Sequence, residues 1–479
     1  MSTQPLWTIA AMADAMHAVR VGALPDAITG ISIDSRTLTN GEAYFAIKGD
    51  VHDGHDFVEA ALKNGAGLAV VAESHRVTFD ERLPLLVVPD VLAGLIDLAH
   101  ASRARSQAKI IAVTGSVGKT STKEALRSVL SAQGETHASA ASFNNHWGVP
   151  LSLARCPASA AFGVFEIGMN HAGEIEPLVK MVRPHVAIVT TVEPVHLEFF
   201  SGIEAIADAK AEIFAGVEPG GAAVLNRDNS QFERLQARAR EAGVSRVVSF
   251  GADAKSDARL IDVALHSACS AVRAEILGHE VTYKLGVPGR HMAMNSLAVL
   301  AAAALAGADL ALAALSLSGI QPAAGRGVRH HLGLTSGSAL LIDESYNANP
   351  ASMAAALDVL GQAEVGPRGR RIAVLGDMLE LGATGPDLHR GLAAAVIANR
   401  IDAVFCCGPL MRNLWDVLPA AKKGGYADNA AALEPQVLTA IGNGDVVTVK
   451  GSLGSRMKMI VTALEKRFPP NASLDDLAV

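Results

Sequence analysis

The sequence predicts an α/β protein of about three domains, and three observations lead to this prediction. The chain has 479 residues, and a domain averages roughly 150 residues. From its middle to its end, short apolar runs alternate with segments of helical periodicity. This alternation favours mostly parallel sheets covered by helices. A glycine-rich turn also separates one apolar run from the helix that follows, as in mononucleotide-binding domains.

The composition narrows the function classes. Half of the residues are hydrophobic, which supports sizeable cores, and the net charge of −7 argues against a general nucleic-acid binder. The four cysteines have no paired metal-ligand spacing, which fits a reducing compartment. The N-terminus lacks the basic start of a signal peptide, and the longest apolar stretch, 297–317, is interrupted by Gly307 and Asp309. We expect a cytoplasmic protein without membrane insertion.

The first region, residues 1 to about 85, mixes short strands and helices. It contains the segments 31–36 (Ile-Ser-Ile-Asp-Ser-Arg), 41–47 and 53–57 (Asp-Gly-His-Asp-Phe). A helix expected near Leu92–Arg105 leads from this region into the next strand.

That next strand carries the most informative motif of the chain. An apolar run, Ile110–Val113, ends in a glycine-rich turn, Thr114–Gly118, and a helix is expected from Lys119. Such a turn points backbone N–H groups at a polyphosphate, with Lys119 on the β- and γ-phosphates and the Thr120 hydroxyl on Mg²⁺. The common pattern begins with a glycine where this chain has Val113, so the shorter T-G-S-x-G-K-T remains. A plain strand-to-helix turn would not explain Lys-Thr after the second glycine.

Polar residues follow the other strands expected in this region, at 162–167, 185–192 and 221–225. The carboxyl ends of parallel strands meet at one edge of a sheet, so these residues should gather at one site. Glu166 ends the first of these strands beside the phosphate loop, where a carboxylate is a natural Mg²⁺ ligand; a salt-bridged glutamate is the alternative. His196 follows the second strand, and an isolated histidine is more often structural than a ligand.

Lys210 lies in an amphipathic segment with helical spacing. The residues alone favour a surface lysine that pairs with Asp208 or Glu212.

Two further polar segments are candidates for substrate contact. Asn144, Asn145 and His146 precede an apolar helix start, so they indicate either substrate contact or a helix cap. In the last region, a dense polar loop follows an apolar strand and ends in Asn349-Pro350, which favours a turn and then a helix start. Its polar residues include Asp343, Tyr346, Asn347 and Asn349.

A domain boundary is expected near Gly319–Gly327, which is rich in glycine and proline. After it the strand and helix alternation restarts, with strands expected at 339–342, 372–375, 403–407 and 446–449. The chain has neither a Gly-x-Ser-x-Gly elbow nor a Cys/His nucleophile context. A phosphate-binding loop, a carboxylate for metal and polar strand ends together fit phosphoryl transfer by positioning and electrostatics.

Motifs along nearly the whole chain make it resemble the ATP-dependent Mur ligases of bacterial cell-wall synthesis. The loop Asp-x-Ser-Tyr-Asn-Ala-Asn-Pro and the segment Gly-Asp-Met-Leu-Glu-Leu-Gly are typical of the branch that adds D-alanyl-D-alanine. The Asp-Asn-Pro-Arg motif of the diaminopimelate-adding relatives is absent from the sequence. The motifs that carry the resemblance lie at 34–36, 53–57, 114–121, 144–150, 166–169, 196–198, 209–214, 289–295, 325–327, 343–350 and 376–382.

The resemblance implies an α/β fold of three domains. A small mixed α/β domain (residues 1–85) would bind the UDP end of the substrate. A central P-loop-type mononucleotide-binding domain (86–320) would bind ATP. A C-terminal Rossmann-like domain (321–479) would close over both.

The resemblance also implies residue roles. Lys119, Lys210 and His196 would be catalytic, with Lys210 carbamylated and therefore a metal ligand rather than a surface cation. Mg²⁺ would be held by Thr120, Glu166, His196 and Lys210. ATP would be bound by Gly115, Ser116, Val117, Gly118, Lys119, Thr120, Ser121, Asn295, Arg326 and Asp343. The other substrates would be bound by Asp34, Ser35, Arg36, Asn144, Asn145, His146, Tyr346, Asn347 and Asn349.

The implied reaction is the joining of D-alanyl-D-alanine to UDP-N-acetylmuramoyl-tripeptide through an acyl phosphate, by a monomer that uses ATP and Mg²⁺. Two alternatives stay open. One is another amide ligase of the same family, such as a folylpolyglutamate or cyanophycin synthetase, although residues 1–85 argue against the former. The other is a nucleotide-regulated binding protein that forms no amide. Two departures from the family pattern stand out: Met292, where asparagine is frequent, and the segment 451–456.

Overall fold

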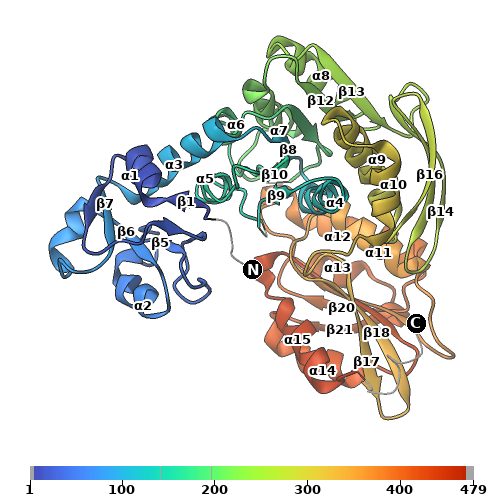
Figure 1. The fold of residues 1–479 in the computed structure, drawn as a ribbon. Coiled ribbons are helices and arrows are strands. Elements are labelled where there is room, and N and C mark those ends of the chain that lie inside the picture. Colours follow the sequence, from blue (N-terminus) through green and yellow to red (C-terminus); the bar gives the residue numbers. More distant parts are fainter. Residues whose placement is uncertain (1–4, 141, 196, 471–479) are drawn as a thin grey trace.

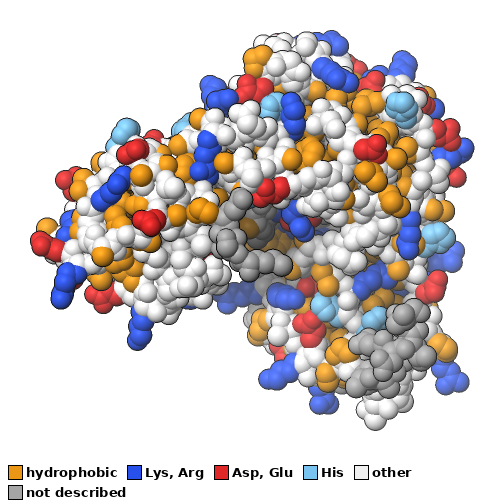
Figure 2. All heavy atoms as spheres, viewed as in Figure 1, with side chains coloured by type: hydrophobic (Ala, Val, Ile, Leu, Met, Phe, Trp, Pro, Cys, Tyr) orange, Lys and Arg blue, Asp and Glu red, His pale blue; other side chains and the backbone are white. Residues whose placement is uncertain are grey.

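The computed structural model describes residues 5–140, 142–195 and 197–470 (Figure 1). In this part of the chain, the strands form three large sheets of five, nine and six strands and one small ribbon, β1 (Trp7–Thr8) with β3 (Ala27–Ile28). The sheets follow one another along the chain and confirm the predicted α/β fold. Figure 2 shows acidic and basic side chains interspersed over one face of the molecule rather than gathered into one charged patch.

The first sheet has the strand order β2-β7-β6-β5-β4, in which β4 to β7 are parallel and β2 is antiparallel. Its strands are β2 (Val19–Val21), β4 (Ile31–Ser32), β5 (Ala43–Phe45), β6 (Leu68–Ala72) and β7 (Leu85–Val88), and its helices are α1 (Ile9–Met16) and α2 (Val58–Lys63). Strand β7 begins at the predicted boundary, and α3 (Val91–Arg105) adds Val91, Leu95 and Leu98 to the same core. The domain boundaries themselves stay predictions.

The second sheet has the order β16-β15-β14-β13-β12-β11-β8-β10-β9 and is parallel from β9 to β14. Its strands are β8 (Lys109–Thr114), β9 (Thr136–Ala138), β10 (Phe162–Glu166), β11 (Val186–Val189), β12 (Ala222–Asn226), β13 (Arg246–Gly251), β14 (Ala258–Leu265), β15 (Ser270–Ile276) and β16 (His279–Leu285).

Helices cover both faces of this sheet. Successive side chains of a strand point to opposite faces, so the apolar residues of β8 contribute to two cores. Ile111 and Val113 of β8 pack in one core with α4 (Lys119–Ser131), α9 (Arg290–Leu305) and α10 (Leu310–Ser316). Ile110 and Ala112 pack in another core with α5 (Gly148–Ala154), α6 (Ile175–Val182), α7 (Ile203–Ala211) and α8 (Phe232–Glu241). This double burial explains why β8 is a continuous apolar run.

The third sheet has the order β17-β18-β22-β19-β20-β21, parallel except for β17. Its strands are β17 (Val328–Leu334), β18 (Gly337–Glu344), β19 (Arg371–Gly376), β20 (Ala403–Cys407), β21 (Lys423–Ala427) and β22 (Val446–Lys450). One face is covered by α11 (Pro350–Gln362), α12 (Gly385–Ala398) and α13 (Arg412–Val417), and the other by α14 (Ala430–Ala440) and α15 (Lys458–Arg467).

The long apolar stretch at 297–317 forms two helices around a turn, as predicted. Gly307 has a φ of 89°, and the Asp309 carboxylate accepts a hydrogen bond from the Leu312 N–H at 2.8 Å and so caps α10. Among the described residues, none of the helices combines the length with the apolar character that a membrane span requires.

The first sheet is attached to the second through α5. The Trp7 indole N–H donates to the Ala154 carbonyl oxygen at 2.9 Å, and the Arg155 Nε donates to the Ile31 carbonyl oxygen at 2.7 Å. The Arg105 guanidinium stacks 3.3 Å from the centre of the Trp7 ring. Because Leu151 and Ala154 of α5 also belong to the core of the first sheet, the two regions share apolar packing as well as hydrogen bonds. They therefore form one packed unit.

We expect Arg155→Met to loosen this attachment. The change keeps the aliphatic stem but leaves the Ile31 carbonyl without its donor, which costs on the order of 1–3 kcal/mol. The measurement is the midpoint of urea unfolding, together with limited proteolysis of the 1–105 region. Arg82→Met is the control, because the Arg82 side chain is 90% exposed. Equal unfolding midpoints for the two variants would contradict the assignment.

Candidate active site

The phosphate loop lies between β8 and α4 and is closely packed on both sides. Gly115 has a φ of 143°, and a Cβ at this position would lie 1.9 Å from the Thr190 hydroxyl oxygen. Gly118 has a φ of 89°, and a Cβ there would lie 2.7 Å from the Asn295 amide nitrogen. Both glycines are therefore required, one by Thr190 after β11 and the other by Asn295 on α9.

The segment after β11 fixes the shape of the loop. The Ser116 N–H donates to the Thr191 carbonyl oxygen at 2.8 Å, and the Ser116 hydroxyl donates to the Glu193 carbonyl oxygen at 3.1 Å. The Thr190 hydroxyl donates to the Val117 carbonyl oxygen at 2.5 Å. Sequence reasoning did not single out Thr190; its position at the carboxyl end of a parallel strand was the available signal.

Lys119 begins α4 and folds back onto its own loop. Its Nζ donates to the Gly115 carbonyl oxygen at 2.6 Å. Burial lowers the pKa of Lys119, the nearby Glu166 carboxylate opposes this shift, and the Arg326 guanidinium adds to it. A polyanion in the loop would relieve the repulsion between Lys119 and Arg326, so this arrangement favours a bound phosphate chain.

Glu166 ends β10 and joins two other predicted site residues. The Thr120 hydroxyl donates to its Oε2 at 2.9 Å, and the Asn144 side-chain amide donates to its Oε1 at 2.8 Å. The Glu166 carboxylate is buried, with 1% of the residue exposed. A carboxylate, a hydroxyl and an amide oxygen close together at a phosphate loop are ligands that Mg²⁺ accepts, so these residues fit a magnesium ion.

Lys210 is buried on α7, with 2% of the residue exposed. Asp208 binds Arg234 and Arg238, and Glu212 accepts hydrogen bonds from the backbone N–H groups of residues 173, 175 and 176 at the start of α6. The surface-lysine interpretation is therefore wrong. Burial and the neighbouring Lys119 charge hold the pKa of Lys210 well below its usual range. Across residues 5–140, 142–195 and 197–470, no hydrogen bond or ion pair holds the Lys210 amine.

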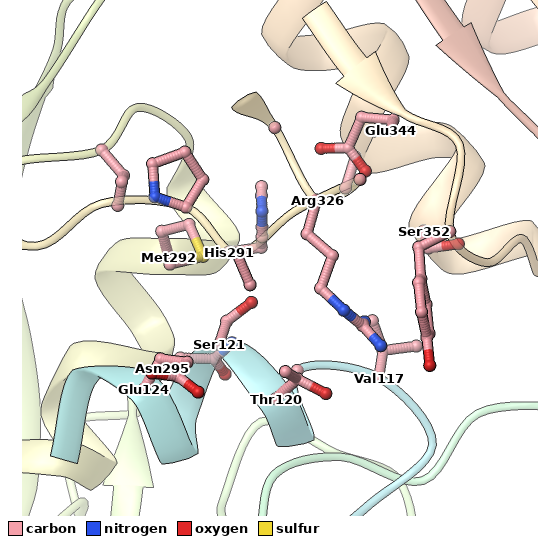
Figure 3. A pocket seen from close by; sticks show the side chains of 18 of the residues that line it. Val117, Thr120, Ser121, Glu124, His291, Met292, Asn295, Arg326, Glu344 and Ser352 are labelled. Atoms are coloured by element: carbon pink, nitrogen blue, oxygen red, sulfur yellow. The ribbon is translucent and has the colours of Figure 1, made fainter. Parts of the chain in front are cut away.

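A cavity of about 680 Å³ lies between the second and third sheets, and the phosphate loop forms part of its wall (Figure 3). Figure 3 shows Arg326 reaching from the linker toward Val117 and Thr120. The guanidinium lies 4.4 Å from the centre of the Tyr346 ring. The predicted site residues that line the cavity are Ser116, Val117, Gly118, Lys119, Thr120, Ser121, Asn144, Glu166, Asn295, Arg326, Tyr346, Asn347 and Asn349.

Lys450 also lines the cavity, although it was not among the predicted site residues. Its Nζ, at the end of β22, donates to Glu344 Oε2 at 3.1 Å and to the Asn347 carbonyl oxygen at 3.0 Å. A lysine at a strand end next to a glycine was the signal in the sequence. The ion pair orients the polar loop after β18 toward the cavity.

Two of the predicted site residues accept hydrogen bonds from nearby backbone N–H groups. Asn349 caps α11: its side-chain oxygen accepts from the Ser352 N–H at 2.9 Å, and Pro350 follows at the first helical position, as predicted. Asn145 accepts from the Gly148 N–H at 2.9 Å at the start of α5, which matches the helix-cap alternative. The neighbouring His146 is exposed.

Other predicted residues lie away from the cavity lining. The buried Asp343 carboxylate accepts from Lys458 Nζ at 2.8 Å and from the Ser345 hydroxyl at 2.6 Å. In the first sheet region, Asp34 and Arg36 form an ion pair at 2.8 Å, and the Ser35 carbonyl oxygen accepts from Asn64. The nucleotide contact of Asp343 and the substrate contacts of the other three stay predictions. His196 lies outside the described residues.

Asp53, His55 and His75 form a separate cluster in the first region whose side-chain atoms are close enough to hold a metal ion. His55 Nε2 accepts from the Ala72 N–H at 2.9 Å, so the proton is on Nδ1, which lies 2.6 Å from the Asp53 carboxylate. A metal on Nδ1 would move a proton to Nε2, where it would face the Ala72 N–H. The cluster is therefore a hydrogen-bond network that holds the loop before α2.

Comparison with known proteins places this site in a family. Three family models match: "Mur ligase family, catalytic domain" at residues 27–116, "Mur ligase middle domain" at 113–303 and "Mur ligase, glutamate ligase domain" at 332–453. The UDP-N-acetylmuramoyl-tripeptide–D-alanyl-D-alanine ligase of Escherichia coli K12 is 33% identical over 92% of this chain and 94% of its own. The Rickettsia prowazekii enzyme of the same name is 30% identical over 90% of this chain and 94% of its own.

Solved structures agree with these relatives. MurF from Acinetobacter baumannii has a TM-score of 0.81 at 28% identity, covering 97% of this chain and all of that one. MurF from Thermotoga maritima, solved in complex with ADP, has a TM-score of 0.74 at 26% identity, covering 91% and 97%. The chain belongs to the Mur ligase family. Within that family it belongs with the MurF ligases, which these relatives and structures represent.

We expect Gly115→Ala to destabilise the phosphate loop. The new Cβ would lie 1.9 Å from the Thr190 hydroxyl, and a positive φ at a non-glycine residue by itself costs on the order of 1–3 kcal/mol. Gly220→Ala is the matched control, because its φ is 79° and a Cβ there meets nothing within 4 Å. Urea unfolding and nucleotide binding by calorimetry check this. Equal effects of the two changes would contradict the packing argument.

Proposed function

We propose that this chain joins D-alanyl-D-alanine to the tripeptide of UDP-N-acetylmuramoyl-tripeptide, with conversion of ATP to ADP and phosphate. The observation that carries the proposal is that the phosphate loop of the central region lines the same cavity as Arg326, Tyr346 and Lys450. The names of relatives that match over nine tenths of the chain support the choice of substrates. The product would be a peptidoglycan precursor.

The chemistry follows from the weakness of a carboxylate as an electrophile. In the first step, an oxygen of the terminal carboxylate of the tripeptide attacks the γ-phosphorus of ATP, and ADP leaves. In the second step, the amine of D-alanyl-D-alanine attacks the carbonyl carbon of the acyl phosphate, inorganic phosphate leaves, and the nitrogen loses a proton. The protein's contribution is to hold the reacting groups in place and to stabilise the charge that develops.

The phosphate loop would bind the ATP phosphates through the backbone N–H groups of residues 117–121, at the N-terminus of α4. Lys119 would exchange its hydrogen bond to the Gly115 carbonyl for one to the phosphates. Arg326 would add a second positive charge from the linker, with Tyr346 holding its guanidinium plane. Asn295 would contact the nucleoside, since it packs against Gly118 at the base of the loop.

Mg²⁺ is proposed as the metal, held by Thr120, Glu166 and a carbamylated Lys210, with His196 at a second ion. When bound, Mg²⁺ supplies charge neutralisation for the phosphates. Carbamylation requires a neutral amine, and burial beside Lys119 favours the neutral form of Lys210. The resulting carbamate would replace a repulsive pair of cations with an attractive pair.

The first region would bind the UDP end of the substrate, with Asp34, Ser35 and Arg36 as candidate contacts. Asn144, Asn145, His146, Tyr346, Asn347 and Asn349 are the candidate contacts for the peptide parts. A cytoplasmic location and a monomeric state stay predictions.

The test of the function is ADP release measured across a set of UDP-muramoyl peptides and dipeptides. We expect release that needs both UDP-N-acetylmuramoyl-tripeptide and D-alanyl-D-alanine, with an amide product seen by mass spectrometry. A folylpolyglutamate-type ligase would instead respond to a folate and glutamate. ADP release that is unchanged by every dipeptide would favour the alternative of a nucleotide-regulated binding protein.

We expect Lys119→Ala to reduce ligation by at least about a thousandfold, because it removes the cation of the loop from the developing phosphate charge. The fold should be unchanged by circular dichroism. Lys109→Ala is the control, since Lys109 is exposed at the start of β8, the strand that precedes the phosphate loop. Near-normal turnover by folded Lys119→Ala would refute the assignment of Lys119.

We expect Lys210→Ala to be nearly inactive, and short carboxylates such as formate or acetate to restore part of its activity. In the unchanged enzyme supplied with ¹³C-bicarbonate, a carbamate signal should appear by NMR and vanish in Lys210→Ala. Lys180→Ala is the control, because its side chain is 57% exposed on α6. Full activity without rescue would show that Lys210 is not a metal ligand.

A further inference from the structure

The cavity has two chemically different ends. Figure 3 shows Val117, Thr120 and Arg326 at one end, where the phosphates would lie. Glu124 lies at the other end with Asn295, and Ser121 lies between Thr120 and Glu124. Since the phosphate loop fixes the position of the phosphates, a nucleotide that fills the cavity must place its base at this second end.

The second end has the composition of a site for a flat heterocycle. Figure 3 shows Met292 on this side of the cavity, and Ala125 and Val287, which also line the cavity, belong to the core against which Met292 packs. The Met292 thioether is suited to contact with an aromatic face. Glu124 and Asn295 are polar groups at this end, and a few such groups typically set specificity in an otherwise apolar pocket. Glu124 is the one acidic residue that α4 contributes to the cavity lining.

The Glu124 carboxylate is held in place by two cations. Lys123 Nζ lies 2.8 Å from Oε1, and Arg127 Nε donates to Oε2 at 2.7 Å. Burial would raise the pKa of Glu124, but the hydrogen bonds from Lys123 and Arg127 outweigh it and lower the pKa. Glu124 is therefore ionised at neutral pH, and an ionised carboxylate can only accept hydrogen bonds.

We propose that Glu124 selects adenine by accepting a hydrogen bond from its exocyclic amino group. This inference rests on the proposed function and adds a specificity residue to it. Hypoxanthine carries a carbonyl oxygen where adenine carries the amino group. That oxygen would face the carboxylate as a second acceptor, so the hydrogen bond at the exocyclic position would be lost. Met292 adds contact area without distinguishing the two bases.

The test compares the binding of ADP and IDP to the full chain by calorimetry. We expect the unchanged protein to bind ADP at least about tenfold more tightly than IDP, since a hydrogen bond to a charged group is worth roughly 1.5–3 kcal/mol. Glu124→Gln should bring the two affinities within about threefold, because the glutamine amide can donate to the carbonyl oxygen. Glu124→Ala should also reduce the difference between the ADP and IDP affinities, although alanine offers the carbonyl oxygen of hypoxanthine no donor.

Two controls separate base selection from other effects. Arg127→Ala removes an ion pair of Glu124 but keeps the carboxylate, so the ratio of affinities should persist. Met292→Ala should weaken ADP and IDP equally. If neither Glu124→Gln nor Glu124→Ala changes the ratio of the ADP and IDP affinities, the inference about Glu124 is wrong. Normal ADP binding and ligation in the unchanged protein would then still support the proposed function. Failure of the unchanged protein to bind either nucleotide would instead overturn the proposed function.

Discussion

The site depends on the close approach of the phosphate loop to the elements on either side of it. Without a Cβ at Gly115, the loop can lie against Thr190, and without one at Gly118, it can lie against Asn295 of α9. The first contact fixes the loop relative to β11, and the second fixes it relative to α9, which also lines the cavity. Backbone N–H groups aimed at one point are useful only if that point does not move, and packing from two sides provides this rigidity.

Much of the fold and part of the site could be predicted from the sequence. The phosphate loop is local: its strand, turn and helix are contiguous, so their geometry follows from a few residues. Glu166 was predicted correctly as a strand-end carboxylate near the loop, since it accepts a hydrogen bond from Thr120. The cap at Asn349 was also a local signal, because Asn-Pro favours a turn that opens a helix.

The rest could not be predicted from the residues because it depends on partners distant in sequence. Local spacing offers Lys210 two carboxylates, Asp208 and Glu212, but α8 supplies arginines to the first and the start of α6 supplies N–H groups to the second. Only the resemblance to a family indicated another role for Lys210. In the same way, the attachment of Asp343 to Lys458 joins residues 115 positions apart, and no local pattern announces it.

The linker has a mechanical consequence. The Gly327 N–H donates to the Asp343 carbonyl oxygen, and the Tyr346 N–H donates to the Gly325 carbonyl oxygen, so the linker is joined to β18 and the loop after it. With Tyr346 stacked on Arg326, the guanidinium is a rigid extension of the third domain rather than a free side chain. The first two regions form one packed unit, so any rotation of the third domain changes the positive potential at the phosphate loop. Through Arg326, the position of the third domain and the charge at the phosphate loop are therefore coupled.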